Sequence, residues 1–486
     1  MLNFRLSLND SQRFLLRNVS IIELGLFINQ MSSTVGSMIL ARVLHDPGKF
    51  GEVNLLLQIF GMVGLFLNAG FNSALVYSFS TEADAAKRDK FRFALFGSLV
   101  FGVFVSILLA AGAPLLAQAY HLPELRGALF AGSIMLIFNS IINIGIAAFS
   151  GNRDFGVQSM FMVMTTVFST AGTVLGVYIP VGGLLWSVSL WMGFGAAATA
   201  TIVSIKVHRA HRPEWFGFIS LRELWKMLKY GVPIWAGNIA KAFQQPFLVM
   251  MIGSGSVVAV GYLTNGLRIT GFIGIVTWAF MIVTFPFVAE CSQDLREAKR
   301  RATICTRYNN FILYPLTLLI CLYPAEISGF LFGPEYAAGD SATYIRLLAL
   351  GVLFSSVSRL GGNILAGIGK TGANFWVMAV AGIGIVAFVP FLAGHAPVLA
   401  VWIYTGGWAA SAAATILFFY REHFPLDWWK AYGEPLLPTC FMGMLLETGR
   451  ISGIGVGWLI VPGLIGLTLL TVYYETAPSR RKIFKM

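Results

Sequence analysis

The stretch Leu228–Ala289 reads LKYGVPIWAGNIAKAFQQPFLVMMIGSGSVVAVGYLTNGLRITGFIGIVTWAFMIVTFPFVA and has the pattern of two long apolar helices joined by the turn Gly253–Ser256. Each helix carries one cation, Lys241 in the first and Arg268 in the second. At 1.5 Å per residue, each cation is roughly 17 Å along its helix. Because the second helix returns through the bilayer, both cations are expected at similar depth, near the middle of a membrane.

Polar residues accompany both cations at helical spacing. Intervals of three and four place them on one helix face. An ionisable group near mid-bilayer costs about 2.5–3.5 kcal/mol, so this face should line a protein interior or a wet cavity. Two interpretations stay open: cations bonded to backbone carbonyls of neighbouring helices, or a basic site for an anionic ligand. On the second interpretation the binding candidates here are Asn238, Lys241, Gln245, Asn265 and Arg268.

The composition identifies a polytopic membrane protein. The chain has 486 residues, 57% hydrophobic and only 12% charged, with a mean hydropathy of +0.74. Soluble globular chains carry about 25% charged residues. The four cysteines have no metal-ligand spacing, so no metal site is expected. Residues Met1–Ser20 lack a cleavable signal, and the first helix is expected to insert as its own anchor.

Fourteen apolar runs are long enough to span a membrane, a length of about 20 residues. Of the 34 lysines and arginines, 26 then fall on the side of the N-terminus, four on the other side and four inside spans. This bias predicts that both termini are cytoplasmic. It also explains most of the net charge of +12 without nucleic-acid binding. The predicted spans are 21–41, 53–79, 92–117, 128–149, 156–179, 182–205, 229–252, 257–289, 305–325, 341–367, 373–393, 397–419, 433–449 and 451–474.

The longest polar connection, Lys206–Lys226, divides the predicted spans into two similar halves. Its end, Leu221–Lys229, mixes charged with large apolar residues and predicts an amphipathic helix at the membrane surface. Internal repeats of this kind are common in transporters, whose sites lie near the midplane between the repeats. The expected organisation is a six-helix bundle (1–205), a cytoplasmic linker with the amphipathic helix (206–228), a second six-helix bundle (229–419) and two additional helices with a basic tail (420–486).

Two further arginines lie inside the tenth predicted span. Ser355, Arg359 and Asn363 are spaced four apart and form a polar stripe. We interpret the stripe as facing the same cavity nearer the cytoplasm, with Arg346 nearer the outer mouth. The alternative is a pair of interfacial arginines that extend to lipid headgroups. Pro246, just past Lys241, is a candidate bending point of the seventh helix, since proline interrupts helical hydrogen bonding.

Several short motifs resemble those of bacterial polysaccharide flippases, the lipid-linked oligosaccharide (O-antigen type) exporters of the MATE-like superfamily. They occur in the family's order and, with fourteen spans in two halves, extend the resemblance over nearly the whole chain. None is a catalytic signature. The motifs are Leu40-Ala41-Arg42-Val43-Leu44 with Phe50-Gly51, Tyr120-His121-Leu122-Pro123-Glu124-Leu125, Phe332-Gly333-Pro334-Glu335-Tyr336, and Leu365-Ala366-Gly367-Ile368-Gly369-Lys370.

The resemblance implies two helical bundles around a central cavity, alternating access, and a substrate built on an undecaprenyl-pyrophosphate-type carrier. Lysine and arginine match pyrophosphate and acidic sugars, which agrees with a cationic interior. A MATE-type exporter of organic cations is an alternative, but it would require carboxylates, and Glu23 and Glu290 lie only at span ends. The lipid II flippase of the same superfamily is a second alternative.

A membrane polysaccharide polymerase or ligase is a less favoured interpretation, because the outer loops are short and carry no acid/base constellation. We therefore expect a transporter of the bacterial inner membrane, with no enzymatic activity and no cofactor. A proton or sodium ion could drive export, but no convincing membrane carboxylate identifies its site. The expected partners are the lipid-linked substrate, membrane lipids and a polysaccharide polymerase with its chain-length machinery.

Overall fold

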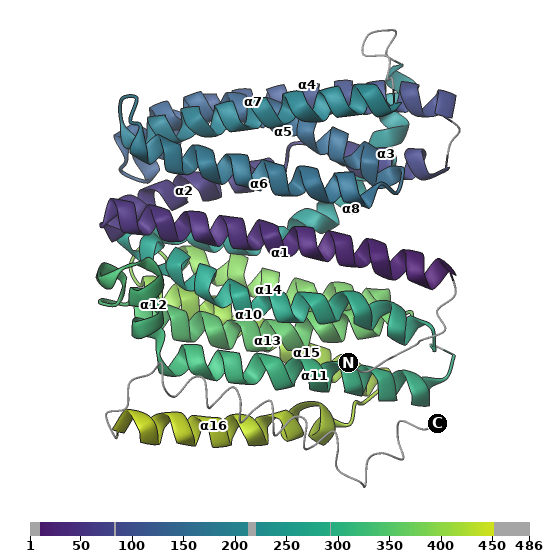
Figure 1. Ribbon diagram of the computed structural model, residues 1–486, viewed down its shortest axis with the longest axis vertical. Coiled ribbons are helices and arrows are strands. Elements are labelled where there is room, and N and C mark those ends of the chain that lie inside the picture. The colour runs from purple at the N-terminus through teal and green to yellow at the C-terminus, as the bar shows by residue number, and fades with distance from the viewer. Residues whose placement is uncertain (1–9, 82–83, 212–219, 292, 452–486) are drawn as a thin grey trace. The chain divides into compact units, whose positions relative to one another are not determined.

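The computed structural model describes residues 10–81, 84–211, 220–291 and 293–451, and throughout these ranges regular secondary structure is helical (Figure 1). No strand occurs in them, which confirms the predicted all-α fold class. The helices are α1 (Asp10–Leu44), α2 (Pro47–Gly64), α3 (Phe71–Thr81), α4 (Asp84–Ala119), α5 (Pro123–Gly151), α6 (Phe155–Tyr178), α7 (Leu184–His211), α8 (Leu221–Ala242), α9 (Gln244–Gly253), α10 (Val257–Ala289), α11 (Leu295–Leu322), α12 (Pro324–Phe332), the 3-10 helix η1 (Pro334–Tyr336), α13 (Ser341–Gly367), α14 (Thr371–Leu392), α15 (Pro397–Arg421), the π-helix η2 (Trp429–Gly433) and α16 (Glu434–Ile451).

Helices lie at each of the first thirteen predicted spans. Within the described ranges, nine helices are individually long and apolar enough to cross a membrane, and α11 with α12, bent by 85°, makes a tenth if counted as one span. The other three predicted spans correspond to α2 with α3, to α8 with α9, and to α16. The fourteenth, 451–474, lies outside the described residues beyond Ile451.

The chain forms two compact units. The boundary between them crosses α10 between Thr264 and Asn265. The predicted four-part organisation, with its linker at 206–228, divides the chain by sequence position and stays a prediction. The first unit comprises Met1–Thr264, Gly329–Tyr336 and Val386–Ala400, and the second comprises Asn265–Ser328, Ala337–Ile385 and Val401–Met486.

In the first unit, α5 packs against α4 and α7, and α6 packs against α7 and α1 (Figure 1). Small residues bring α1 and α6 together. Gly25 lies against Ser159, whose hydroxyl donates a hydrogen bond of 3.1 Å to the carbonyl of Ile21, and Gly36 lies against Thr170. Such residues allow membrane helices to approach closely, which gains dispersion contacts where lipid offers no hydrophobic driving force.

The starts of α2 and α10 cross at two glycines of the first unit. A Cβ atom on Gly51 would lie 1.8 Å from the carbonyl oxygen of Val257, and one on Gly261 would lie 2.2 Å from that of Pro47. Neither position has room for a side chain, because backbone fills the space. The glycine of the first family-like motif, Gly51, is therefore required by packing.

The second predicted span is not continuous, because a turn over Leu65–Gly70 separates α2 from α3. Two residues of the turn have positive φ, Ala69 at 42° and Gly70 at 89°. Helix α8 fits against this break: a Cβ atom on Gly231 would lie 2.1 Å from the Gly70 carbonyl oxygen, and Trp235 Nε1 donates a 3.0 Å hydrogen bond to the carbonyl of Leu65. Helix α8 thus supplies a hydrogen-bond donor for the Leu65 carbonyl, which lies where the helix is broken.

The seventh predicted span is also divided, between Ala242 and Gln244. On either side helical bonding continues, since Phe243 donates to the carbonyl of Ile239 at 2.9 Å and Phe247 donates to that of Phe243 at 3.0 Å. Pro246 has no N–H with which to reach the carbonyl four residues earlier. The interruption lies at Phe243, three residues before the proline that the sequence marked, and Pro246 falls in the first turn of α9.

The predicted amphipathic helix is the first part of α8 rather than a separate element. Leu224 and Met227 are buried in the first unit, whereas Trp225 is 69% exposed. Glu223 is paired with Lys226 at 2.5 Å and with Lys90 of α4 at 2.6 Å. The hydrogen bonds from these two lysines lower the pKa of the Glu223 carboxyl to about 2.

In the second unit, α11 packs against α13, α16 and η2 (Figure 1). Hydrogen bonds from buried hydroxyls add α15: Thr405 donates to the carbonyl of Leu347 in α13 at 2.9 Å, and Ser411 donates to that of Val377 in α14 at 2.6 Å. These bonds hold helices together where polar groups cannot bond to water.

Gly51→Ala is expected to destabilise the protein by about 1–3 kcal/mol, because the new methyl group would overlap the Val257 carbonyl oxygen. Gly61→Ala in the same helix is the matched control. Nothing lies within 4 Å of a Cβ atom there, so it should be neutral or slightly stabilising. Thermal unfolding of the two purified variants measures the difference, and equal melting temperatures would contradict the packing account.

Candidate functional site

The first-unit members of the predicted cationic site lie around the junction of α8 and α9. Lys241 is the last but one residue of α8, three residues after Asn238. The side chains of both fall outside the described residues. Gln245 is exposed on the first turn of α9. Its neighbour Gln244 is only 4% exposed, and Gln244 Oε1 has no hydrogen-bond partner in the described part of the chain.

The second-unit members lie on α10, where Arg268 is partly buried and Asn265 is fully buried. Asn265 Nδ2 donates a 2.6 Å hydrogen bond to Ser328 Oγ of α12. This is the contact expected of an amide that joins two helices, so Asn265 serves helix packing in this structure. Because Lys241 and Arg268 belong to different units, their joint action on one ligand stays a prediction.

The polar stripe of α13 is held by several different partners. Ser355 donates to the carbonyl of Val352 in its own helix at 3.0 Å, and Asn363 Nδ2 donates to that of Met281 in α10 at 3.1 Å. The Arg359 guanidinium lies 5.0 Å from the centre of the Trp408 ring. The ring of Trp408 is thus a partner for the charge of Arg359.

Arg346, the other arginine of this span, is exposed. Its Nε donates a 3.1 Å hydrogen bond to the carbonyl of Cys321, near the end of α11. A cation at the C-terminus of a helix interacts favourably with the helix dipole. This contact is local to the second unit, and the predicted place of Arg346 near an outer mouth is still to be tested.

A buried polar network in the second unit was missed by the sequence analysis. Asn309 Nδ2 donates to Asn310 Oδ1 at 3.1 Å and to Ser356 Oγ at 3.0 Å, and Thr277 also donates to Ser356 at 3.0 Å. Asn310 in turn donates to the carbonyl of Ala431 in η2 at 2.9 Å. The network joins four elements. Its sequence signal was a pair of adjacent asparagines in an apolar run.

A buried ion pair lies close to this network. Arg307 Nε of α11 is 3.0 Å from Glu434 Oε2, at the start of α16. The two side chains are only 13% and 6% exposed. By sequence position, Arg307 lies at the start of the ninth predicted span and Glu434 at the start of the thirteenth. A residue pattern along one helix does not show which residue of another helix it pairs with.

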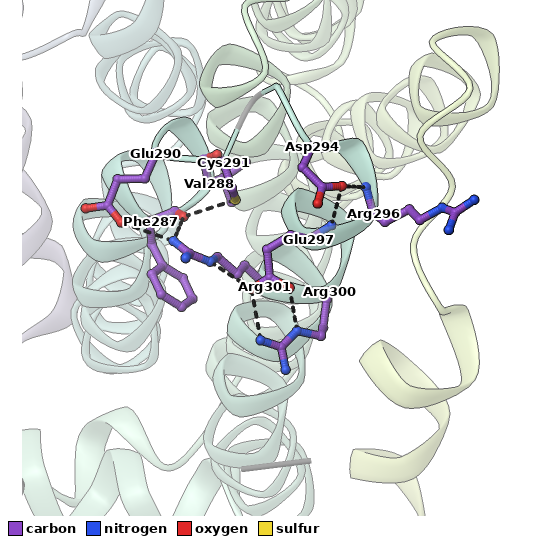
Figure 2. A network of polar contacts seen from close by, with 9 residues as sticks. All are labelled: Phe287, Val288, Glu290, Cys291, Asp294, Arg296, Glu297, Arg300 and Arg301. Atoms are coloured by element: carbon purple, nitrogen blue, oxygen red, sulfur yellow. Dashed lines mark hydrogen bonds and ion pairs between the residues drawn. The ribbon is translucent and has the colours of Figure 1, made fainter. Parts of the chain in front are cut away.

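Arg301 fastens the connection between α10 and α11 (Figure 2). Its Nη1 donates to the Phe287 carbonyl at 2.9 Å and lies 3.1 Å from Glu290 Oε2, while its Nε donates to Glu297 Oε1 at 3.1 Å. Asp294 caps α11 by accepting from two backbone N–H groups of its first turn. These contacts make the connection a structural clamp, which accounts for the carboxylate at the end of the eighth span.

Two of the family-like motifs meet within the first unit. Phe50 packs edge-on against Tyr336, with ring centres 5.4 Å apart. Arg42 donates to the carbonyl of Phe330, and His45 Nδ1 lies 3.6 Å from Glu335 Oε1. Tyr120, from another family-like motif, lies against Gly253 of α9. The two motifs that meet therefore pack α1 and α2 against α12 and η1.

The described residues offer cations, amides and hydroxyls rather than a reactive constellation. No three His, Cys, Asp or Glu residues gather there as a metal site. Such a set of groups can bind an anion or a hydroxyl-rich molecule.

Solved membrane transporters share this fold. A lipid II flippase, MurJ, in an inward closed conformation matches with a TM-score of 0.77 and 12% identity over 96% of this chain and 99% of that chain. An inward-facing MATE transporter of the MOP superfamily matches with a TM-score of 0.66 and 15% identity, over 81% of this chain and 94% of that chain. A MOP superfamily transporter from Pyrococcus furiosus matches with a TM-score of 0.58 and 16% identity, over 85% of this chain and 96% of that chain. At these identities the likeness concerns the fold.

A family model described as polysaccharide biosynthesis protein matches residues 39–339, more than half of the chain. The chain belongs to this family. A curated relative, an uncharacterized membrane protein of Methanocaldococcus jannaschii, is 24% identical over 180 residues, 32% of this chain and 34% of the relative. The chain thus aligns with about a third of that relative's length. The family match and the shared fold agree with the predicted resemblance to MATE-like polysaccharide flippases.

Asn310→Ala is expected to destabilise this family member by about 1–3 kcal/mol, because it leaves the Ala431 carbonyl and one Asn309 N–H buried without partners. Gln245→Ala, which removes an exposed amide, should change stability by no more than about 0.5 kcal/mol. Thermal unfolding in detergent compares the two. A tolerated Asn310→Ala would show that the network contributes little to the fold.

Proposed function

We propose that this protein moves a lipid-linked oligosaccharide on an undecaprenyl-pyrophosphate-type carrier from the cytoplasmic to the outer leaflet of the bacterial inner membrane. Alternating access through a central cationic cavity is the proposed mechanism. The observation that carries the proposal is the match of a polysaccharide-biosynthesis family to residues 39–339 of a chain with a transporter fold. We expect no chemical step, and a polysaccharide polymerase with its chain-length machinery as the downstream partner.

The charges inside the helices support an anionic cargo. Lys241, Arg268 and Arg359 all lie within predicted spans. Arginine presents a planar fork that matches phosphate oxygens, and lysine supplies a compact charge. Of the charged residues whose side chains the structure describes, only Glu434 is buried, and it is paired with Arg307. A cavity for organic cations would require unpaired carboxylates, so the MATE-type exporter is disfavoured.

A lipid II flippase is the second candidate, because a solved structure of one matches almost the whole of this chain. Both cargoes carry a pyrophosphate on a polyprenyl chain and differ in the sugar. The two functions separate in cells: loss of an oligosaccharide flippase removes surface polysaccharide, whereas loss of a lipid II flippase stops peptidoglycan synthesis.

Lys241→Ala and Arg268→Ala should each reduce export while leaving membrane insertion intact, because each removes a charge that holds the cargo's acidic part. Arg268→Lys should be partly tolerated, since the charge remains although the bidentate fork is lost, and a change to Glu should be worse than Ala. Complementation of a flippase-deficient strain, with membrane abundance of each variant, measures this.

Arg296→Ala serves as the matched control, since it removes an exposed cation outside the predicted cavity. Full surface polysaccharide from both Ala variants would show that the cationic site is wrong. Loss of export that follows loss of protein from the membrane would assign the two cations a structural role.

The proposed topology places both termini in the cytoplasm. The charge bias places the C-terminal tail in the cytoplasm. A reporter that is active in the cytoplasm should therefore be active when fused after Met486, and a reporter that is active only outside the cell should not. Fusions after 120 and 151, on opposite sides of the fourth predicted span, provide the internal comparison. A C-terminal reporter active only outside the cell would overturn the even number of spans.

A further inference from the structure

The start of α8 carries large apolar side chains that the protein leaves exposed. Leu221 is 79% exposed and Trp225 is 69% exposed, and with Val232, which is also exposed, they form a row that we call the apolar stripe. The opposite side of the helix, with Leu224 and Met227, is buried in the core of the first unit, where α8 packs against α3 and α4. Packing within the protein therefore accounts for one apolar side of this helix and not for the other.

Cations follow the same exposed side of the helix. Arg222, Lys226 and Lys229 are all exposed, and we call them the basic stripe. Intervals of four and three residues place them in one row. The apolar stripe has intervals of four and seven and lies directly beside it. One exposed face of α8 thus presents a row of large apolar side chains next to a row of positive charges.

The carboxylates that α8 and α4 place among these cations already have partners. Glu223 is paired with Lys226 at 2.5 Å and with Lys90 at 2.6 Å, and Asp89 is paired with Arg92 at 2.8 Å. The end of α7 adjoins this region, because its residue Val207 belongs to the same buried core as the inner side of α8. Further exposed cations of α4 and α7 here are Arg88, Lys206 and Arg209.

The basic start of α11 is built differently. There Arg300 and Arg301 pair with Glu297 at 2.8 and 3.1 Å, and Arg301 also pairs with Glu290 at 3.1 Å. Those cations fasten the connection between α10 and α11. The two exposed stripes of α8 have no comparable use inside the protein, which indicates a partner outside the chain.

The two stripes match the chemistry of a membrane surface. Tryptophan and leucine side chains are favoured at the boundary between lipid headgroups and acyl chains. Lysine and arginine are attracted to anionic headgroups, and each such cation strengthens membrane attachment about fivefold. The charge bias of the sequence predicts that this end of the first unit lies at the cytoplasmic surface. A surface of this composition therefore fits a lipid that carries a negative charge.

We propose that the exposed face of α8 is a binding surface for anionic phospholipids of the cytoplasmic leaflet. The apolar stripe lies at the boundary of the acyl chains, and the basic stripe contacts the phosphate groups. Because α8 is one helix from Leu221 to Ala242, the bound lipids also fix the level of its far end, where Lys241 lies. The inference goes beyond the proposed cargo and rests only on the predicted membrane topology.

Quenching of tryptophan fluorescence by brominated lipids tests the contact directly. The full-length protein is placed in bilayers that mix phosphatidylglycerol and phosphatidylcholine, with bromine on the acyl chains of one lipid at a time. The contribution of Trp225 is the difference between the wild type and Trp225→Phe. For this contribution, the binding constant of phosphatidylglycerol relative to phosphatidylcholine should be about five or more. Salt at about 1 M should remove most of the preference, because it screens the charges.

Two double variants separate the basic stripe from positive charge in general. Arg222→Gln with Lys229→Gln should bring the relative binding constant close to one. Lys226 is kept in this variant, because it pairs with Glu223. The matched control, Arg296→Gln with Arg421→Gln, removes two exposed cations of the second unit on the same predicted side of the membrane. It should leave the relative binding constant unchanged.

Equal quenching of Trp225 by the two lipids would overturn the proposal. A preference that the first double variant keeps, or that both double variants lose alike, would overturn it as well. The other occupant of such a face is a protein partner in the cytoplasm. Quenching of Trp225 by aqueous iodide and by neither lipid would favour that occupant over phospholipid and count against the proposal.

Discussion

The cost of leaving a backbone N–H or C=O group without a partner in hydrocarbon shapes this molecule more than any other constraint. It explains why the regular secondary structure of the described residues is helical. It also explains what surrounds the two interrupted helices. At the turn after α2, Trp235 donates to the Leu65 carbonyl, and at the start of α9 helical bonding resumes within one residue of the break. Irregular backbone survives only where another element or the next turn satisfies it.

The same constraint extends to side chains. Hydroxyls of buried serines and threonines bond to carbonyls of their own or a neighbouring helix, as Thr405 does with Leu347. Asn265 bonds to Ser328, and Asn363 bonds to a carbonyl of α10. Amides that the sequence assigned to a binding face thus also hold helices together. Packing and binding need not exclude each other, since an amide has two donors and an acceptor with two lone pairs.

Charges follow a stricter rule than neutral polar groups. Three arginines of the second unit have partners of different kinds. Arg359 contacts an aromatic face, Arg346 donates to a carbonyl near a helix end, and Arg307 pairs with a carboxylate. Only the last of these partners can change its own charge.

The sequence alone determined the class of this protein. Long apolar runs and charge bias decide membrane insertion, and short ordered motifs indicated the family that residues 39–339 match. It also marked Pro246, three residues past the break between α8 and α9, because proline's missing N–H is a local property. Tertiary structure decided the rest: the break over Leu65–Gly70, the glycine crossing at Gly51 and Gly261, and the pairing of Arg307 with Glu434. These depend on residues far apart in sequence, and a helical pattern records which face a residue occupies but not which helix it meets.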